Sequence, residues 1–194
     1  LETAQAIIDQ DGDKYLDMPE KERLEIFKDR AYAEKLKALK RDLAHFNVHY
    51  DNWFSERTLH PDAVQAACKV LQERGKIYEK DGALWLKSTD YGDDKDRVVI
   101  RDNGVPTYLA ADIAYHKNKY DRGFKSLINI WGADHHGYVA RVKAAIAALG
   151  YDPKQLEVLL LQMVSLFRDG KPVKMSKRTG QAITLNELIE EVGT

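Results

Sequence analysis

The sequence has 194 residues, of which 44% are hydrophobic and 31% charged, and its formal net charge is −1. This is the composition of an ordinary globular protein, and the near-neutral charge excludes one that attracts nucleic acid through an overall positive field. The single cysteine, Cys68, excludes an internal disulfide framework and is typical of a reducing cytoplasm. Because no apolar run approaches membrane-spanning length and no signal peptide is visible, we expect a cytoplasmic protein with no membrane partner.

The first part of the chain is predicted to be helical. Residues 2–10 have a weak helical pattern that residues 11–13 interrupt, and Pro19 suits the first turn of a long helix over about residues 19–45. Apolar residues recur along this helix at spacings of three and four and predict one apolar stripe, made of Leu24, Phe27, Ala31, Leu36, Leu39, Leu43 and Phe46. We interpret the charged residues on its other faces as solvated surface rather than an RNA-binding surface.

A short strand and a further helix are predicted next. Residues 48–50 favour a short strand, and Pro61 is expected to open a helix that ends at Gly75. The residues of this helix predicted to face inward are Val64, Ala67, Cys68 and Leu71.

Two hairpins follow this helix. Residues 76–87 predict a hairpin around an Asp-Gly turn, because both central residues of such a turn tolerate positive φ. A second hairpin is expected around Asn103 and Gly104, entered by residues 97–101. The polar and acidic residues 88–96 between the two hairpins predict a loop.

Helices and strands then alternate along the chain. The predicted elements are a helix at 109–119, a buried strand at 127–131, a helix at 139–149 that Gly150 ends, and a buried strand at 158–161. This alternation is typical of a parallel α/β sheet, whose ligands bind beyond the carboxyl ends of the strands. We therefore expect the candidate site residues to follow these strands.

One candidate site is the run Gly-Ala-Asp-His-His-Gly-Tyr at residues 132–138, directly after a predicted strand. Gly132 lets the backbone approach a ligand, Asp134 can accept hydrogen bonds from a ribose diol, and either His135 or His136 can contact phosphate or sugar. A metal site is an alternative because Asp and His are both metal ligands, although neighbouring His side chains diverge and no further cluster completes the site. A purely structural turn is a third interpretation, and we favour nucleotide contact.

A second candidate is the pair Tyr108 and Asp112 at the start of a predicted helix. Residues four apart lie on one helix face, so the phenol and the carboxylate form a surface that suits a cation. The carboxylate can pair with a guanidinium through two hydrogen bonds, and the ring offers a π face. The alternative is that both are ordinary surface residues at a helix start.

A third candidate lies near the end of the chain. Residues 167–173 predict a short hairpin around an Asp-Gly turn, and the basic loop that follows places Lys174 and Lys177 around the small Ser176. Such a loop can bend around a polyphosphate and supply several ammonium groups. A solvated basic loop with no ligand is the alternative.

Four motifs in this order resemble those of arginyl-tRNA synthetases. They are Arg-Val-Val-Ile-Arg at 97–101, Pro-Thr-Tyr-Leu-Ala-Ala-Asp-Ile-Ala-Tyr at 106–115, Gly-Ala-Asp-His-His-Gly-Tyr at 132–138 and Val-Lys-Met-Ser-Lys-Arg at 173–178. The last is similar to the KMSKS signature of class I aminoacyl-tRNA synthetases. The resemblance covers most of the chain and is strongest from about residue 82 to residue 193.

This resemblance implies a fold and a function. The fold is α/β, with the second half of a Rossmann-like class I catalytic domain at residues 106–194 and a connecting region of helices and β-hairpins at residues 1–105. The function is that of an arginine–tRNA ligase, which uses ATP with Mg²⁺ to activate arginine. The expected partners are arginine, ATP and tRNA(Arg), and the intact enzyme is expected to be a monomer.

The resemblance also implies roles for single residues. Tyr108 and Asp112 would contact arginine, and Lys174 and Lys177 would be catalytic residues that steady the triphosphate. The implied ATP-site residues are Gly132, Asp134, His135, His136, Met175 and Ser176. Ala133 stands where some family members have a Gln that contacts arginine, so this contact is not carried over.

Two other functions stay open at this point. One is a non-catalytic RNA-binding module descended from a synthetase, and the other is a metal-dependent phosphoesterase with an Asp-His-His motif, here at residues 134–136. The sequence begins at Leu1 without an initiator Met, stops at Thr194 within a predicted helix and contains no HIGH-type motif. We therefore expect a piece of a longer enzyme, inactive by itself.

Overall fold

The computed structural model of the protein describes residues 2–173 and 183–193. The chain forms two compact units, one made of Leu1–Trp53 with Phe167–Thr194 and the other of Phe54–Leu166. These units are defined by contacts within the chain. They differ from the two parts expected from the family resemblance, which meet between residues 105 and 106. That boundary stays a prediction.

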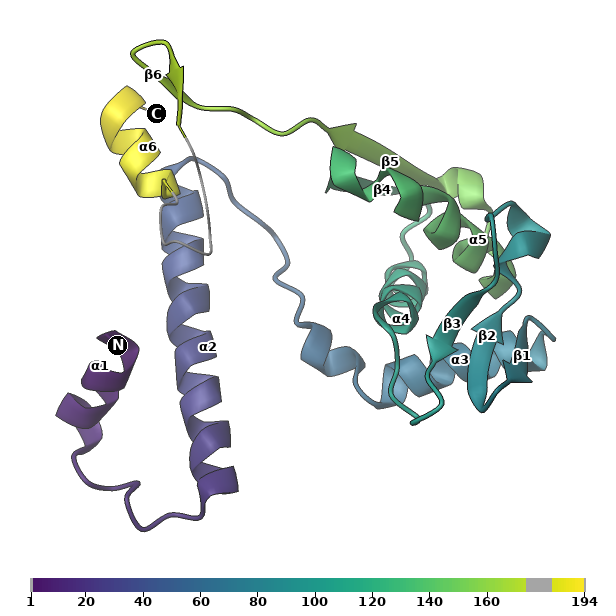
Figure 1. The fold of residues 1–194 in the computed structure, drawn as a ribbon, viewed down its shortest axis with the longest axis horizontal. Helices are drawn as coiled ribbons and strands as arrows, with labels where there is room; N and C mark the ends of the chain where they lie inside the picture. Colours follow the sequence, from purple (N-terminus) through teal and green to yellow (C-terminus); the bar gives the residue numbers. More distant parts are fainter. Residues whose placement is uncertain (1, 174–182, 194) are drawn as a thin grey trace. The chain divides into compact units, whose positions relative to one another are not determined.

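The first unit contains the two N-terminal helices and the C-terminal segment. Its elements are α1 at Glu2–Asp11, α2 at Glu20–His45, β6 at Phe167–Arg168, β7 at Lys171–Pro172 and α6 at Leu185–Val192 (Figure 1). Tyr15 connects α1 to α2, because its buried ring meets the edge of Phe27 at 5.2 Å and its hydroxyl donates to Asp11 at 2.8 Å. Asp11 also pairs with Arg30 of α2.

The long helix is confirmed, but its apolar stripe is not buried. No residue of α2 is buried, and the Leu24 side chain remains 55% exposed. Within this unit α6 packs against α2, α1 is joined to α2 by the Asp11–Arg30 ion pair, and Asp42 of α2 forms a hydrogen bond with Asn186 of α6. Among the helices that the structure describes here, these two leave much of the stripe uncovered.

The strand predicted at residues 48–50 is wrong. Asn47 takes a positive φ of 57° at the end of α2, and the backbone N–H of Val48 donates to the carbonyl of Leu43 at 2.8 Å. The N–H that a strand would use therefore closes the helix C-terminus instead.

The second unit begins with a helix and a three-stranded antiparallel sheet. The elements are η1 at Glu56–Leu59, α3 at Asp62–Glu73, β1 at Ile77–Lys80, β2 at Ala83–Leu86, η2 at Ser88–Tyr91 and β3 at Arg97–Ile100. The sheet order is β1-β2-β3, and the predicted hairpin at residues 76–87 is confirmed. All four residues predicted to face inward from α3 are buried.

The second predicted hairpin is only partly correct. The turn forms, with Gly104 at a φ of 77° and the N–H of Arg101 donating to the carbonyl of Val105 at 3.0 Å. The returning chain makes a single bridge between Ile100 and Pro106, and β3 pairs with β2 instead. Pro106 has no N–H to extend a ladder, and the next residue already caps a helix.

An α/β layer completes this unit. Its elements are α4 at Tyr108–Asp121, β4 at Leu127–Gly132, η3 at Ala133–Tyr138, α5 at Val139–Leu149, η4 at Pro153–Gln155 and β5 at Leu156–Leu161. β4 and β5 pair in parallel, as predicted, with Leu127 opposite Leu156 and Gly132 opposite Leu161. Helix α5 contributes to both hydrophobic clusters, one with α3, α4 and the antiparallel sheet and one with α4 and the parallel strands.

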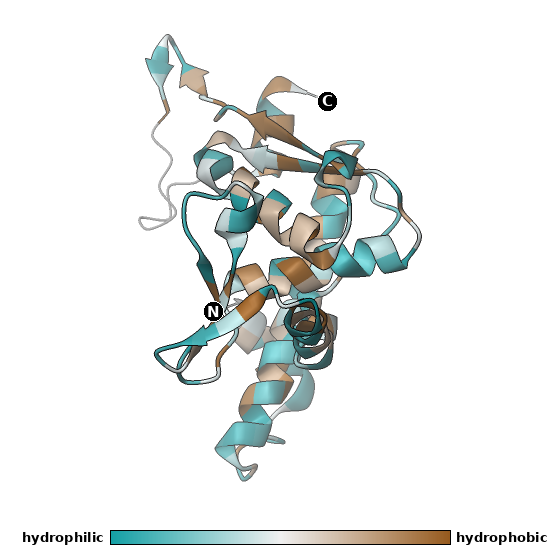
Figure 2. Ribbon diagram, turned by 90° about the vertical axis from the view of Figure 1, so that its right-hand side faces the viewer, coloured by the Kyte–Doolittle hydropathy of each residue, from teal (hydrophilic) through white to brown (hydrophobic). Residues whose placement is uncertain are grey.

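The sequence predicted that both parallel strands are buried, but the structure covers only one of their faces. Ile128 and Ile130 of β4 are 60% and 63% exposed, and Leu159 and Leu161 of β5 are also exposed. Figure 2 shows the apolar residues of these strands in brown. Within the described residues α4 and α5 pack on one face of this pair, so only alternate side chains are covered. No described helix is both long enough and apolar enough to span a membrane.

Candidate active site

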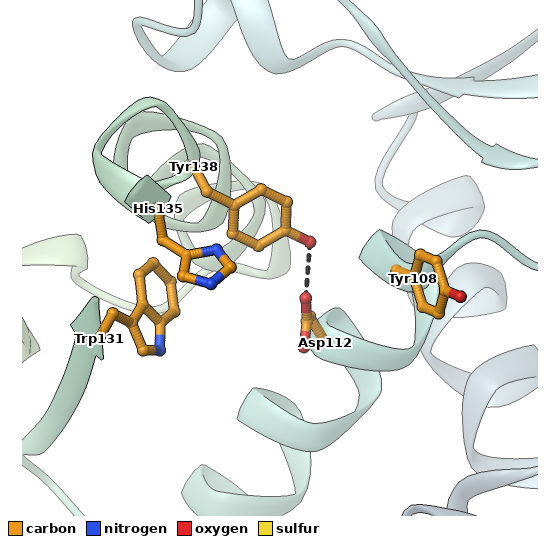
Figure 3. Close-up of a pocket in the computed structure, with 5 residues that line it drawn as sticks. All are labelled: Tyr108, Asp112, Trp131, His135 and Tyr138. Carbon is orange, nitrogen blue, oxygen red and sulfur yellow. Dashed lines mark hydrogen bonds between the residues drawn. The ribbon is translucent and has the colours of Figure 1, made fainter. Parts of the chain in front are cut away.

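A pocket of about 370 Å³ lies in the second unit, where α4 meets the carboxyl end of β4. Five side chains line it: Tyr108 and Asp112 from α4, Trp131 from β4, and His135 and Tyr138 from η3 (Figure 3). Its volume is within the range of small-molecule sites. Its place beyond a parallel strand is where ligands bind in α/β folds.

The first turn of α4 places Tyr108 and Asp112. Thr107 caps this helix in an extended conformation, and its hydroxyl donates to the carbonyls of Val98 and Val99 at 3.0 and 3.2 Å. The helix start is therefore fixed to β3. Tyr108 is 84% exposed, and in Figure 3 its hydroxyl points away from the Asp112 carboxylate. The predicted cation surface thus opens to solvent on the Tyr108 side.

Asp112 is connected to the loop that follows β4. The hydroxyl of Tyr138 donates to Asp112 Oδ2 at 2.6 Å, a short distance typical of a hydrogen bond to a carboxylate. Burial and, next, the hydrogen bond to this carboxylate raise the pKa of Tyr138 well above its usual value. The phenol therefore remains a donor across the physiological pH range.

Behind Asp112, two buried polar side chains connect α4 to β4. The ring of His116 donates from Nδ1 to the carbonyl of Asp112 at 2.7 Å, and the side-chain amide of Asn129 donates to Nε2 at 2.8 Å. Burial lowers the pKa of His116, so the ring is neutral and its Nε2 can accept. Lys119 donates to the Asn129 oxygen at 3.4 Å.

The predicted nucleotide run forms the 3₁₀ turn η3. A Cβ at Gly132 would meet Asp134 Oδ1 at 2.5 Å, so the carboxylate folds back over this glycine. The side chains of Asp134 and His135 are 73% and 60% exposed, and His136 is exposed as well. His135 lines the pocket with its ring centroid 6.3 Å from that of Trp131.

The structure thus brings three of the predicted site residues into one pocket. These are Tyr108, Asp112 and His135, while Gly132, Asp134 and His136 belong to the adjoining turn but do not line it. Their expected roles stay predictions.

Sequence reasoning assigned no role to Trp131 or Tyr138. Trp131 lies near the carboxyl end of β4, and Tyr138 ends η3 immediately before α5. The first carried a usable signal, because an aromatic residue at the carboxyl end of a parallel strand lies where ligands bind. Tyr138 belongs to the candidate run at residues 132–138, but its contact with Asp112 could not be predicted because the two residues are 26 positions apart.

The residues Lys174, Met175, Ser176 and Lys177 lie outside the described part of the chain. The hairpin before them is confirmed, with φ angles of 51° and 72° at Asp169 and Gly170. Helix α6 follows them and begins with a capping box between Thr184 and Glu187. Arg168 of β6 donates to both carboxylate oxygens of Glu191 on α6, at 3.0 and 2.5 Å.

The metal interpretation of residues 134–136 gains no support from the described residues. His135 Nε2 is 3.8 Å from Asp134 Oδ2, and within residues 2–173 and 183–193 no group of three or more potential ligands could hold an ion. The phosphoesterase alternative therefore has no assembled ligand set in this part of the chain.

Comparison with known proteins gives consistent results. Residues 10–193 match the family described as tRNA synthetases class I (R), catalytic domain. The arginine–tRNA ligase of Carboxydothermus hydrogenoformans is 58% identical over the whole chain, which spans 35% of that protein. That of Moorella thermoacetica is 60% identical over 94% of the chain, which spans 33% of it.

Solved structures agree with these relatives. A crystal structure assigned to an arginyl-tRNA synthetase of Campylobacter jejuni has a TM-score of 0.88 and 42% identity, covering 99% of this chain and 41% of its own. The arginyl-tRNA synthetase of Thermus thermophilus has a TM-score of 0.68 at 21% identity, over 98% of this chain and 39% of its own, which supports the fold alone. The chain spans about a third of the length of the curated relatives quoted above.

Proposed function

Because the chain belongs to the family of class I (R) tRNA synthetase catalytic domains, we propose that it is part of an arginine–tRNA ligase. The intact protein would activate arginine with ATP to arginyl-adenylate and transfer the arginyl group to tRNA(Arg). The proposal concerns the intact protein, since this chain spans only about a third of its curated relatives.

The observation that carries the proposal is the carboxylate of Asp112 inside an aromatic pocket. Tyr108, Trp131 and Tyr138 line this pocket together with the acid. The hydroxyl of Tyr138 donates a hydrogen bond to Oδ2 of Asp112, and no described residue forms a hydrogen bond with Oδ1. A guanidinium donates in a plane and stacks on aromatic faces, so this lining suits the side chain of arginine better than a compact ammonium.

ATP is proposed to bind beside this pocket, along the turn that follows β4. Gly132 would let the nucleotide approach the backbone, and Asp134, His135 and His136 present exposed polar side chains on η3. Mg²⁺ would arrive with ATP, because this ion is usually held by substrate phosphates and one or two carboxylates. Asp134 is the carboxylate of this turn.

The chemistry requires positioning and positive charge. The carboxylate of arginine attacks the α-phosphate of ATP, and pyrophosphate leaves with the electron pair of the broken P–O bond. Asp112 would hold the far end of arginine so that its carboxylate faces the nucleotide. Lys174 and Lys177, with Met175 and Ser176 shaping their loop, would neutralise charge on the leaving group.

The proposal also covers the cellular compartment and the oligomeric state of the intact protein. Cys68 is free and buried, as is common in a reducing compartment, and we place the protein in the cytoplasm as a monomer.

The substitution Asp112→Asn in the intact protein tests this function. The amide keeps the size and removes the charge, so the KM for arginine in ATP–pyrophosphate exchange should rise at least about tenfold while the KM for ATP stays within about twofold. Asp121→Asn, at the other end of α4 and paired with Lys117, is the matched control and should change neither constant. An equal rise in both KM values, or no arginine-dependent exchange by the unmodified protein, would contradict the proposal.

A further inference from the structure

Tyr138 lines the pocket and ends the run at residues 132–138, but the sequence assigned it no role of its own. It ends η3, and its hydroxyl reaches across to Asp112 on α4, as the dashed line in Figure 3 shows. The 2.6 Å hydrogen bond therefore joins the turn after β4 to the acid proposed to receive arginine. The two residues are 26 positions apart, so the contact exists only in the folded unit.

The ring of Tyr138 contacts two other side chains. Its centroid is 5.8 Å from that of Trp131, and the guanidinium of Arg141 lies over it at 4.9 Å. The residue is half-buried and also packs against both hydrophobic clusters of the unit. Because the ring is fixed in this way, its hydroxyl presents a donor at a defined place.

A carboxylate that receives a hydrogen bond from a fixed donor has fewer orientations open to it. With Oδ2 engaged by Tyr138, rotation of the Asp112 carboxylate is restricted before a ligand arrives, and Oδ1 remains for the incoming guanidinium. Without this donor the carboxylate would rotate among several positions, and binding would have to restrict it.

We propose that Tyr138 is a positioning residue for arginine, which orients the Asp112 carboxylate for the guanidinium through its hydroxyl. The inference rests on the proposed function. It assigns to Tyr138 no contact with ATP and no part in the chemical step, so its removal acts on the affinity for arginine.

The test is a double-mutant cycle in the intact protein, measured by ATP–pyrophosphate exchange. Tyr138→Phe keeps the ring contacts and removes the hydroxyl, and it should raise the KM for arginine about tenfold, because a hydrogen bond to a charged group is lost. The KM for ATP and kcat should stay within about twofold. In the Asp112→Asn background the same change should raise the KM for arginine less than about twofold, since the oriented charge is already absent.

Tyr151→Phe is the matched control. Tyr151 also donates to an aspartate of α4, Asp121, at 3.4 Å, but neither residue lines the pocket. This variant should leave the KM for arginine unchanged. Thermal unfolding of each variant shows whether the fold is retained.

The outcomes separate the inference from the proposed function. An unmodified protein without arginine-dependent exchange would overturn both. An active protein whose Tyr138→Phe variant keeps its KM for arginine would overturn the inference alone. So would an equal effect of Tyr138→Phe in both backgrounds, which indicates direct contact with arginine. An unfolded Tyr138→Phe variant would overturn it as well, because the hydroxyl would then hold the fold.

Discussion

The side chains of His116 and Asn129 meet inside the second unit, with Nε2 and Nδ2 2.8 Å apart. His116 lies one turn after Asp112 on α4, and Asn129 lies in the middle of β4. Both are buried, and each depends on the other for a hydrogen bond. Through the second ring nitrogen of His116, this pair connects the strand to the carbonyl of the proposed arginine-binding residue.

Removal of the Asn129 amide should destabilise this connection. Asn129→Ala leaves the buried Nε2 of His116 without its donor, which costs about 1–3 kcal/mol in the free energy of local opening. Hydrogen exchange of the backbone amides of α4 and β4 measures this energy directly. Asn52→Ala, at an exposed position, is the control and should change it by less than about 0.5 kcal/mol. Unchanged protection of both elements in Asn129→Ala would show that the pair is not structural.

The stability of this unit should fall as the pH drops below about 6.5. Burial lowers the pKa of His116 from its ordinary value of 6.5, and the nearby charge of Lys119 lowers it further. Between the lowered pKa of the folded chain and the ordinary value of 6.5, the unfolded chain therefore binds a proton at His116 more readily than the folded chain does. Stability consequently rises with pH up to about the unfolded pKa and is fully present above it.

This pH dependence is measured by chemical unfolding of the intact protein at several pH values between 5 and 8. His116→Gln removes the titrating ring and should flatten the curve between pH 5 and 6.5 relative to the unmodified protein. His60→Gln removes an exposed ring near Glu56 and serves as the control, which should follow the unmodified curve. If both variants give the same curve as the unmodified protein, His116 does not account for the acid sensitivity.

The ion pair of Asp93 and Arg97 should be a major stabilising contact of the antiparallel sheet. Arg97 donates to both oxygens of Asp93 at 2.8 Å, and these side chains are only 12% and 2% exposed, respectively. Asp93→Asn removes the buried charge partner of this guanidinium and leaves only the exposed Asp94, so it should cost about 3 kcal/mol in the free energy of unfolding. Asp94→Asn also removes a carboxylate that meets Arg97, but Asp94 is 75% exposed and its loss should cost less than about 1 kcal/mol. Equal losses in urea unfolding would contradict this difference.

Local features of the fold could be predicted from the sequence because neighbouring residues determine them. The Asp169-Gly170 turn, the inward face of α3 and the shared face of Tyr108 and Asp112 all follow from backbone preference or from helical periodicity. The short strand predicted at residues 48–50 is wrong because the types of three residues do not show where a backbone N–H finds its acceptor. Here the N–H of Val48 closes α2.

Features that depend on residues far apart in the chain could not be predicted from the sequence. The apolar runs of β4 and β5 indicated strands, but the exposure of Ile130 depends on which elements cover each face. The site shows the same limit, since Asp112 was found by its spacing from Tyr108 while its hydrogen bond with Tyr138 depends on tertiary packing. His116 and Asn129 were missed for this reason, because a buried histidine has no distinctive sequence pattern.

Lys177 is predicted to act on the transition state of arginine activation. It lies outside the described residues, and its role rests on the motif at residues 174–178 and on the proposed function. As the bond to pyrophosphate breaks, negative charge grows on the leaving phosphates, and an ammonium placed there stabilises the transition state more than the bound substrates. By analogy with other such charge contacts, Lys177→Ala should lower the rate of ATP–pyrophosphate exchange about 10²–10³-fold.

Equilibrium binding of arginine to the Lys177→Ala variant, measured by calorimetry, should remain within about twofold, because the guanidinium is recognised elsewhere. Lys171→Ala removes an exposed lysine of the preceding hairpin and should leave the exchange rate unchanged, which excludes a general effect of lost positive charge. Near-normal exchange by Lys177→Ala would assign the basic loop to solvated surface, whereas equal losses in both lysine variants would show that overall charge, and not this ammonium, drives the reaction.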